Sequence, residues 1–432
     1  MRQYKDSGIE WIGKIPETWE VMQIRRVMRN RSERNQPDAM VLSLYRDLGI
    51  VPKESRDDNH NVTSEDTANY KVVSKGNFVI NKMKAWQGSM AVSEYDGIVS
   101  PAYYVCSFTR EVCKKYVHYL LRDASYKPEY LRLSTGMRIG QWDLNIEDFL
   151  RIKTILPPVE EQQCIADYLD LKCGEIDSLI ALQEQMIEKL KAYKQSVITE
   201  AVTKGLDPNA KLVPSSIDWI GEIPEGWKVE PFKVLFRTGK GLSFTKADLV
   251  SEGIPVISYG QVHSKQNTGT RIDDILIRFV PENIAKSGET SKVNIGDFIF
   301  ADTSEDLSGC GNCVYVDKEI GLYAGYHSVI AFSKRKESNA YLAYLFLTDC
   351  WRSQIRCRVS GIKVFSISQS IIKQTSVILP PEDEQNSIVS YLDEKCTDID
   401  HLIALKQKKI DSLKDYKKSV IYETVTGKTI IE

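Results

Sequence analysis

The sequence lacks the long apolar run that a membrane-spanning helix requires. None of its apolar stretches approaches the roughly 18 residues of such a helix. The first residues, MRQYKDSGIEW, also lack the apolar core of a secretory signal peptide. We therefore expect a cytoplasmic protein that contacts no membrane. Its 432 residues are enough for two or three domains with separate cores. A content of 42% hydrophobic and 27% charged residues is that of an ordinary globular protein.

The sequence also lacks the residue spacing that is typical of a disulfide framework or of a metal site. The nine cysteines are scattered, and their odd number in a large cytoplasmic chain predicts buried thiols. Cys310 and Cys313 form a C-x-x-C pair, but no second pair follows at zinc-finger spacing. The five histidines form no metal-spaced pair either. We expect no metal in this chain.

The chain has no excess of positive charge, since its formal net charge is −2. This balance argues against a protein that is basic over its whole surface. It does not exclude a nucleic-acid binder, because binding needs only a local basic face.

Common catalytic motifs are missing. A methyltransferase that modifies base amines would need Asn or Asp before Pro-Pro, whereas Leu156 and Leu379 stand there. The Gly-x-Gly at Gly309 lacks the third glycine of a dinucleotide-binding loop, and TGKT near the C-terminus has Tyr422 where a phosphate loop needs its first glycine. A nuclease site of spaced acids and lysines stays open, although no group of residues stands out.

What the sequence does contain is a repeat. ILPPVEEQQCIADYLDLKCGEIDSLIAL begins at Ile155, and ILPPEDEQNSIVSYLDEKCTDIDHLIAL begins at Ile378. Between residues 155–203 and 378–426, 29 of the 49 aligned positions are identical at a constant offset. The chain is therefore an internal duplication.

A second repeated block precedes each copy of the first. IEWIGKIPETWEV begins at Ile9 and IDWIGEIPEGWKV at Ile217. The stretches between the blocks, about 22–154 and 230–377, share only scattered matches such as GNFVI at Gly76 and GDFIF at Gly296. The repeated blocks are thus alike in the two copies, whereas the stretches between them have diverged. We expect each tryptophan block to pack the start of its domain onto a helix.

The blocks after each Pro-Pro predict long helices. Acidic residues follow Pro157-Pro158 in the first turn, where they suit the positive end of the helix dipole. Gly205 and Pro208 predict the end of the first helix. Mostly apolar residues then recur by steps of four and three, which is a coiled-coil seam. Its members are Leu169, Cys173, Ile176, Ile180, Gln183, Ile187, Leu190, Lys194 and Val197, and in the second copy Leu392, Cys396, Ile399, Ile403, Lys406, Ile410, Leu413, Lys417 and Val420.

The variable stretches alternate short β-like runs with turns, and each ends in a helical patch. We predict an α/β protein with two mixed α/β domains separated by two long antiparallel helices, in a pseudo-twofold arrangement. The expected divisions are a first globular domain with its tryptophan block at 1–155, a central helix at 156–204, a linker with the second tryptophan block and second globular domain at 205–378, and a C-terminal helix and tail at 379–432.

The whole arrangement resembles the specificity (S) subunit of type I restriction–modification enzymes. The resemblance covers nearly all of the chain and rests on KDSGIEWIGKIPETWEV, on LPPVEEQ, on KLKAYKQSVITEAVTKGLDP and on their second copies. It implies two target-recognition domains, each reading one half of a bipartite, asymmetric DNA site. It further implies that the helix pair sets the unread spacer.

The resemblance also implies partners. Two methyltransferase (M) subunits would dock on the helix pair, carry S-adenosylmethionine and flip out the target adenine. Nuclease–translocase (R) subunits would consume ATP, with Mg. This chain would then bind double-stranded DNA, hold no cofactor and perform no catalysis, in agreement with the missing motifs.

Polar and aromatic loops within the variable stretches supply candidate DNA contacts. Arginine pairs with guanine and glutamine with adenine in the major groove, and Arg356 and Arg358 are predicted to contact phosphate. Arg138 and Lys363 lie at similar distances before the two Pro-Pro pairs. The candidates are Lys82, Lys84, Trp86, Gln87, Arg138 and Gln141 in the first domain, and Tyr259, Gln261, His263, Lys265, Arg356, Arg358 and Lys363 in the second.

Two other classes of function remain. A non-catalytic scaffold or adaptor would place two protein- or sugar-binding domains on the same helical ruler, and it predicts neutral, aromatic domain faces. A nuclease predicts metal-dependent cleavage by the purified chain. The duplication without catalytic motifs favours a DNA reader over both.

Overall fold

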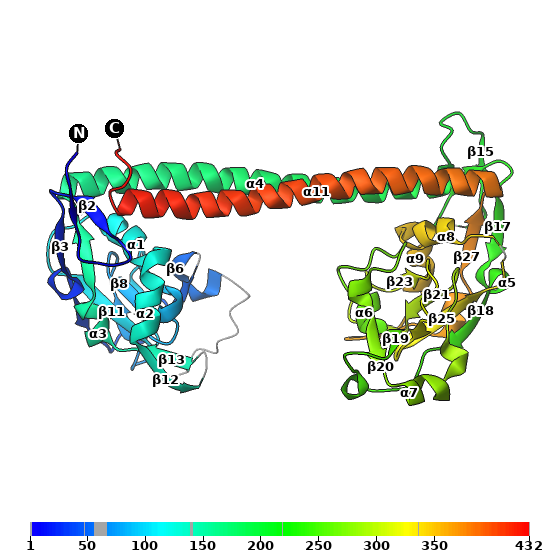
Figure 1. Ribbon diagram of the computed structural model, residues 1–432, viewed down its shortest axis with the longest axis horizontal. Helices are drawn as coiled ribbons and strands as arrows, with labels where there is room; N and C mark the ends of the chain where they lie inside the picture. Colours follow the sequence, from blue (N-terminus) through cyan, green and yellow to red (C-terminus); the bar gives the residue numbers. More distant parts are fainter. Residues whose placement is uncertain are drawn as a thin grey trace. The chain divides into compact units, whose positions relative to one another are not determined.

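The computed structural model describes residues 2–46, 48–55, 67–138, 141–217, 219–335 and 337–431. The chain divides into two compact units. Unit 1 holds residues 1–184 and 407–432, and unit 2 holds residues 185–406 (Figure 1). Each unit therefore contains one globular part, half of helix α4 (Val159–Lys204) and half of helix α11 (Glu382–Val425).

The globular part of unit 1 is mostly antiparallel. Its central sheet has the strand order β4-β11-β8-β9, and strand β8 is buried on both faces because it reads Phe-Val-Ile. The elements are β1 Tyr4–Asp6, β2 Lys14–Pro16, β3 Glu20–Gln23, β4 Met28–Arg31, β5 Leu42–Tyr45, β6 Gly49–Pro52, β7 Lys71–Val73, β8 Phe78–Asn81, β9 Met90–Val92, β10 Gly97–Val99, β11 Tyr103–Phe108, α1 Lys114–Arg122, α2 Lys127–Leu133, β12 Ser134–Arg138, β13 Gln141–Leu144, α3 Ile146–Arg151 and β14 Lys153–Leu156, with short 3-10 turns η1 Ile24–Arg26, η2 Lys53–Ser55, η3 Ala85–Gln87 and η4 Ala124–Tyr126.

Unit 2 repeats this plan. Its sheet order β18-β25-β21-β23 matches that of unit 1 strand for strand, and a further sheet, β20-β19-β24, is added beside it. The elements are β15 Leu212–Pro214, β16 Glu222–Pro224, β17 Lys228–Pro231, α5 Phe232–Leu235, β18 Phe236–Lys240, β19 Ile254–Ile257, α6 Tyr259–Val262, β20 Arg278–Val280, α7 Glu282–Ser287, β21 Phe298–Ala301, β22 Thr303–Ser304, β23 Cys313–Tyr315, β24 Tyr323–Ala324, β25 Ser328–Ser333, α8 Ala340–Phe346, α9 Asp349–Arg356, β26 Phe365–Ser366, α10 Gln369–Lys373 and β27 Ser376–Leu379, with short 3-10 turns η5 Lys246–Asp248, η6 Asp274–Leu276 and η7 Glu289–Ser291.

The tryptophan blocks fasten each globular part to its helix. The indole of Trp19 donates a hydrogen bond of 3.0 Å to Glu161 in the first turn of α4. Trp227 makes the equivalent bond, also 3.0 Å, to Glu384 in the first turn of α11. Both indoles are buried, so the predicted packing of these blocks against the helices is confirmed.

The helix halves pair antiparallel within each unit. In unit 1, Lys417 lies 2.7 Å from Asp177, and in unit 2, Lys194 lies 2.7 Å from Asp400. These are the same two positions of the repeat, 223 residues apart, with the partners exchanged. Both lysines come from the predicted seam, whose apolar members Leu169 and Leu392 are fully buried.

Each globular part also binds the end of the helix from the other repeat. The hydroxyl of Tyr116 on α1 donates to the carbonyl of Val425 at 3.0 Å, and Tyr341 on α8 donates to that of Val202 at 2.7 Å. Each unit therefore combines a globular part, the start of its own helix and the end of the other. The predicted class of fold, two mixed α/β domains with two long antiparallel helices, is confirmed.

Candidate nucleic-acid interface

The loop after β8 in unit 1 and the loop after β21 in unit 2 occupy the same place in the fold. The amide of Leu144 donates to the carbonyl of Lys82 at 3.1 Å, and the amide of Ile367 donates to that of Asp302 at 2.7 Å. In each unit this bond ties the loop to the segment that precedes the last short helix. We call residues 82–89 and 302–312 the central loops.

The central loop of unit 1 carries four of the predicted DNA contacts. Lys82 lies 3.5 Å from Asp143 of β13, and Lys84 is exposed. The ring of Trp86 meets that of Trp142 edge to face at 5.0 Å. The carboxamide oxygen of Gln87 accepts from the guanidinium of Arg46. Lysines and aromatic rings thus lie side by side, a combination that suits phosphate and base contacts.

Arg138 and Gln141 face each other across the β12–β13 hairpin, which lies beside the central loop of unit 1. The backbone of both residues is described, but their side chains lie outside the described residues. Their proposed contacts therefore stay predictions from the sequence.

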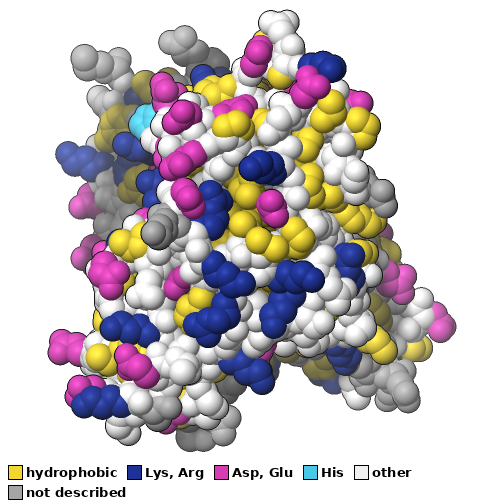
Figure 2. Space-filling model, turned by 90° about the vertical axis from the view of Figure 1, so that its right-hand side faces the viewer, with side chains coloured by type: hydrophobic (Ala, Val, Ile, Leu, Met, Phe, Trp, Pro, Cys, Tyr) yellow, Lys and Arg dark blue, Asp and Glu magenta, His cyan; other side chains and the backbone are white. Residues whose placement is uncertain are grey.

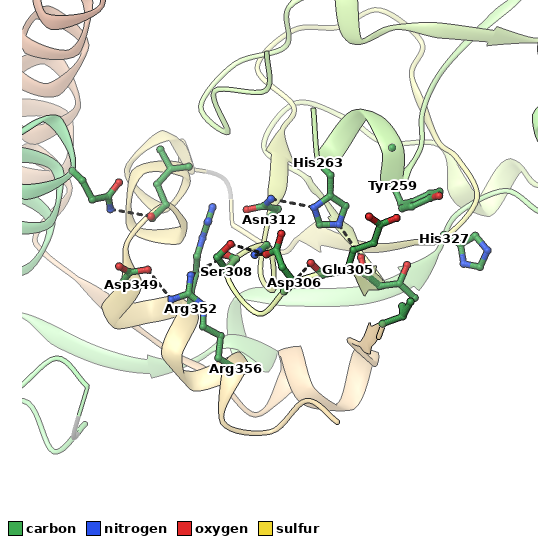
Figure 3. Close-up of a pocket in the computed structure, with 17 residues that line it drawn as sticks. Tyr259, His263, Glu305, Asp306, Ser308, Asn312, His327, Asp349, Arg352 and Arg356 are labelled. Carbon is green, nitrogen blue, oxygen red and sulfur yellow. Dashed lines mark hydrogen bonds and ion pairs between the residues drawn. The ribbon is translucent and has the colours of Figure 1, made fainter. Parts of the chain in front are cut away.

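In unit 2 the central loop lines a cavity of about 940 Å³ (Figure 3). Three of the predicted residues, Tyr259, His263 and Arg356, lie on its wall. The other lining residues are Gln195, Gly260, Thr303, Ser304, Glu305, Asp306, Ser308, Gly309, Asn312, His327, Leu347, Asp349, Arg352 and Val364. The chain folds so that α6, the central loop, α9 and the segment before β26 meet here.

The imidazole of His263 is held on both sides. Its Nε2 lies 2.8 Å from the backbone carbonyl oxygen of Thr303, and its Nδ1 lies 3.2 Å from the side-chain nitrogen Nδ2 of Asn312. The Tyr259 ring stands 6.4 Å from it and 5.5 Å from the ring of His327. These side chains form a fixed polar and aromatic wall (Figure 3).

The same central loop is acidic. The carboxylate of Asp306 accepts bonds of 2.6 Å from the hydroxyl of Ser308 and from the amide of Gly309. These bonds, that of Ser308 first, hold the pKa of Asp306 below its usual value, so this carboxylate is ionised near neutral pH. The adjacent Glu305 is exposed to solvent.

Glu305 and Asp306 are not among the residues predicted from the sequence, although the sequence holds a signal for them. The central loops begin the same number of residues after the matching segments GNFVI and GDFIF. Extending this alignment matches Glu305 and Asp306 with the loop of unit 1 that holds Lys84 and Trp86.

Arginines from α9 close one side of the cavity. Arg356 donates to Asp349 at 2.7 Å and to the carbonyl of Ser308 at 3.0 Å. Arg352 donates to the carbonyl of Phe346 at 2.8 Å, and burial lowers its pKa. Arg358 is exposed and donates to the carbonyl of Gln354. Of the two arginines predicted to bind phosphate, Arg358 is thus the more accessible.

The remaining candidates differ in what their side chains already do. The carboxamide oxygen of Gln261 accepts from the amide of Ser258 at 3.1 Å and so caps helix α6. Lys265 and Lys363 are exposed. Lys363 and Arg358 belong to the same turn-rich segment before β26. Strand β26, which follows this segment, pairs with β22 in the central loop through Ser366 and Thr303.

A separate basic surface lies on elements that occur at equivalent positions in both units. Figure 2 shows Lys and Arg side chains gathered on one face of unit 2. Exposed Lys233 and Arg237 lie on α5 and β18, and exposed Arg25 and Arg29 hold the equivalent positions of unit 1. The local basic faces that nucleic-acid binding requires are therefore present although the net charge is −2.

Within the described part of the chain, no three His, Cys, Asp or Glu side chains come together as metal ligands. Cys310 and Cys313 are both buried, and burial raises the pKa of Cys313 to about 12. A protonated thiol is a poor metal ligand. Among the described helices, none is both long and apolar enough to cross a bilayer.

Comparisons with known proteins agree with this architecture. The family model of the type I restriction modification DNA specificity domain matches residues 16–192 and 224–415. The chain is 26% identical over 314 residues to the type I restriction enzyme MjaVIII specificity subunit of Methanocaldococcus jannaschii, covering 72% of this chain and 69% of that protein. It is 22% identical to the putative MjaX specificity subunit of the same organism, covering 98% and 97%.

Solved structures show the same fold. A chain from a study of complex assembly and conformational transition of the type I R-M system superposes with a TM-score of 0.69 at 15% identity, covering 96% of this chain and 99% of that one. The HsdS subunit from Thermoanaerobacter tengcongensis gives a TM-score of 0.51 at 14% identity, covering 96% and 98%.

Proposed function

The chain belongs to the family of type I restriction–modification DNA specificity subunits, and from this premise we propose how its parts divide the work. Unit 1 reads one half of a bipartite, asymmetric DNA site, and unit 2 reads the other half. One observation carries this proposal. The two units share sheet order, tryptophan blocks and helices, yet their central loops hold lysines in one unit and carboxylates in the other.

Direct readout explains why the central loops differ. Lysine donates to guanine, whereas a carboxylate accepts from the amino group of cytosine. Two readers of the same half-site would need the same groups, and two readers of different half-sites need different ones. Each good contact contributes about 1–3 kcal/mol of discrimination, so joining two short readers on one chain multiplies selectivity.

The helix pair sets the spacer between the half-sites. Half-sites read from one face of a duplex lie about one helical turn apart. A continuous paired helix keeps the spacing of its readers constant, whatever sequence each central loop recognises. The repeated ion pairs Lys417–Asp177 and Lys194–Asp400 fix the register of the helices.

The outer faces of the helices dock two methyltransferase subunits. Large apolar side chains remain exposed at the same repeat positions in both units, and clustered exposed apolar residues mark protein-binding sites. Because the surface occurs twice, it binds two copies of one partner. Its members are Leu179, Leu182 and Tyr416 in unit 1, and Leu402, Leu405 and Tyr193 in unit 2.

The chemistry belongs to the partners. In this proposal the chain is not an enzyme and holds no cofactor. The methyltransferase subunits carry S-adenosylmethionine, and nuclease–translocase subunits use ATP and Mg. The substrate is double-stranded DNA, which places the protein in the cytoplasm.

The decisive experiment maps adenine methylation on a plasmid, with the neighbouring methyltransferase subunit expressed together with this chain or without it. We expect a bipartite motif with an unread gap only when the chain is present. Exchanging residues 22–154 for those of a relative should change one half alone. Identical methylation with and without the chain would favour the adaptor function instead.

A further inference from the structure

Ile362 stands out among the large apolar side chains of the described residues, because 99% of it is exposed to solvent. It lies in the turn Gly361-Ile362-Lys363-Val364, just before β26. A Cβ atom at Gly361 would collide with the carbonyl oxygen of Val364, so the tight turn depends on this glycine. A fully exposed isoleucine buries no apolar surface and so adds nothing to the stability of the fold. Its exposure points to a contact with another molecule.

The surroundings of Ile362 indicate the kind of partner. The next residue but one, Val364, lines the cavity of unit 2 and is half exposed. Two exposed cations, Lys363 and Arg358, lie in the same segment. An apolar tip flanked by cations fits a polyanion that carries apolar groups in a groove. Duplex DNA has this character, since the thymine C5-methyl group projects into the major groove between two rows of phosphates.

The sequence of unit 1 also has an isoleucine at the same distance before its central-loop bond. Leu144 and Ile367 make the same bond to the central loops, and they fix the alignment of the two segments. Five residues before each of them stands an isoleucine, Ile139 and Ile362, although their neighbours differ. Ile139 lies outside the described residues, so this match is one of sequence.

We propose that Ile362 is a specificity-determining residue of unit 2 that packs on the C5-methyl group of a thymine in the second half-site, while Lys363 binds the adjoining backbone. This inference rests on the proposed function and adds a chemical identity to one position of the motif: a T·A pair lies opposite the turn.

The test uses the chain purified with its methyltransferase subunit and short duplexes that carry the mapped motif. In the half read by unit 2, each thymine is replaced in turn by deoxyuridine, which removes only the methyl group. We expect the wild-type complex to lose about fourfold in affinity at one position, the value of one buried methyl-sized group. The Ile362→Ala complex should bind the thymine and deoxyuridine duplexes equally at that position.

Matched variants separate this contact from general effects. Ile295→Ala removes another exposed isoleucine of unit 2, 53% exposed, and should keep the wild-type response to deoxyuridine. Lys363→Ala should weaken binding to both duplexes and lower its salt dependence, again with the thymine response retained. Ile139→Ala should abolish a thymine response in the first half only.

Several results would overturn the inference. They are a second half-site without thymine, a wild-type complex indifferent to every deoxyuridine, or equal loss by Ile362→Ala on both duplexes. Loss of the methyltransferase subunit from the Ile362→Ala complex would show that the turn binds protein. If the wild-type complex does not prefer the motif over a scrambled duplex, the proposed function itself fails.

Discussion

The two central loops are held by equivalent backbone hydrogen bonds, but they carry side chains of opposite charge. In unit 1 the loop presents Lys82, Lys84 and Trp86, and in unit 2 it presents Glu305 and Asp306 beside His263. The strands on either side are buried and alike in both units. The fold of each unit is therefore independent of the side chains that its central loop carries. Framework and readout can therefore be disturbed separately.

The framework should show the largest effect, and it should be equal in the two units. Trp19→Ala and Trp227→Ala each remove a buried indole and its bond to the first turn of a long helix. We expect each to destabilise its own unit by about 3–5 kcal/mol, measured by hydrogen exchange of that unit's strands. Lys84→Ala, on an exposed loop, is the control and should leave exchange unchanged. A large loss in only one unit would contradict the equivalence of the two frames.

Charge changes in the two central loops should alter DNA affinity in opposite directions. Replacing Lys82 and Lys84 by Glu should weaken DNA binding, whereas Glu305→Lys should strengthen binding to any sequence and make the slope of log affinity against log salt concentration more negative by about 0.9. Each change should alter base preference by about 1–3 kcal/mol at one position of its own half-site. Titrations against motif and scrambled duplexes at several salt concentrations measure both effects.

The control for these charge changes is Lys286→Glu on α7, a lysine that pairs with Glu282 away from the cavity. It should change neither half of the motif. A central-loop variant that altered the half-site of the other unit would refute the division of labour between the two units.

Acid should also distinguish the two units. Burial, with help from the Arg122 guanidinium, lowers the pKa of His118 in α1 from 6.5 to about 3. The unfolded chain therefore binds this proton first as the pH falls, and unit 1 loses stability between pH 6.5 and 3, by at most about 1.4 kcal/mol per pH unit. Unit 2 has Ala343 at the equivalent position and lacks this contribution.

Hydrogen exchange of α1 and β9 from pH 6.5 to 4.5 would measure the acid effect, with His118→Gln as the matched variant. Its carboxamide oxygen retains an acceptor for the amide of Val92, which bonds to His118 at 3.2 Å. The variant should flatten the pH dependence of unit 1 and leave that of unit 2 unchanged. An unaltered profile would mean that other groups cause the acid response.

The repeated ion pairs should give the smallest effect. Lys194→Glu and Lys417→Glu each break a partly exposed bridge between the helices, worth about 0.2–1 kcal/mol. Adding Asp400→Lys or Asp177→Lys should restore the loss in the same unit. Double-mutant cycles in urea measure the coupling energy, and clearly different values for the two pairs would break the symmetry.

The sequence predicted the framework because its signals are local and periodic. Leu169 and Ile176 recur at helical spacing, and a Pro-Pro pair marks the start of each helix, so the long helices and their seam followed directly. The repeat then predicted two similar α/β units.

The candidate site was harder to predict because it is assembled from distant segments. Tyr259, Glu305 and Arg356 meet only through the tertiary fold, and an exposed glutamate in a sequence rich in acids looks like ordinary surface. Gln261 resembles a base-reading glutamine, yet its side chain caps a helix, a role that depends on backbone geometry. Ile362 was overlooked because only its exposure distinguishes it from a core residue.

The division of the chain also has a consequence for its synthesis. Every residue of unit 2 has left the ribosome once Lys406 has emerged, whereas unit 1 still lacks residues 407–425, on which the first half of α4 packs. The globular part that is made first is thus completed last. Its Tyr116 cannot form its hydrogen bond to the carbonyl of Val425 until the end of α11 has been made. A nascent chain that stalled after Lys406 had emerged would contain all of unit 2, whereas unit 1, made first, would stay incomplete.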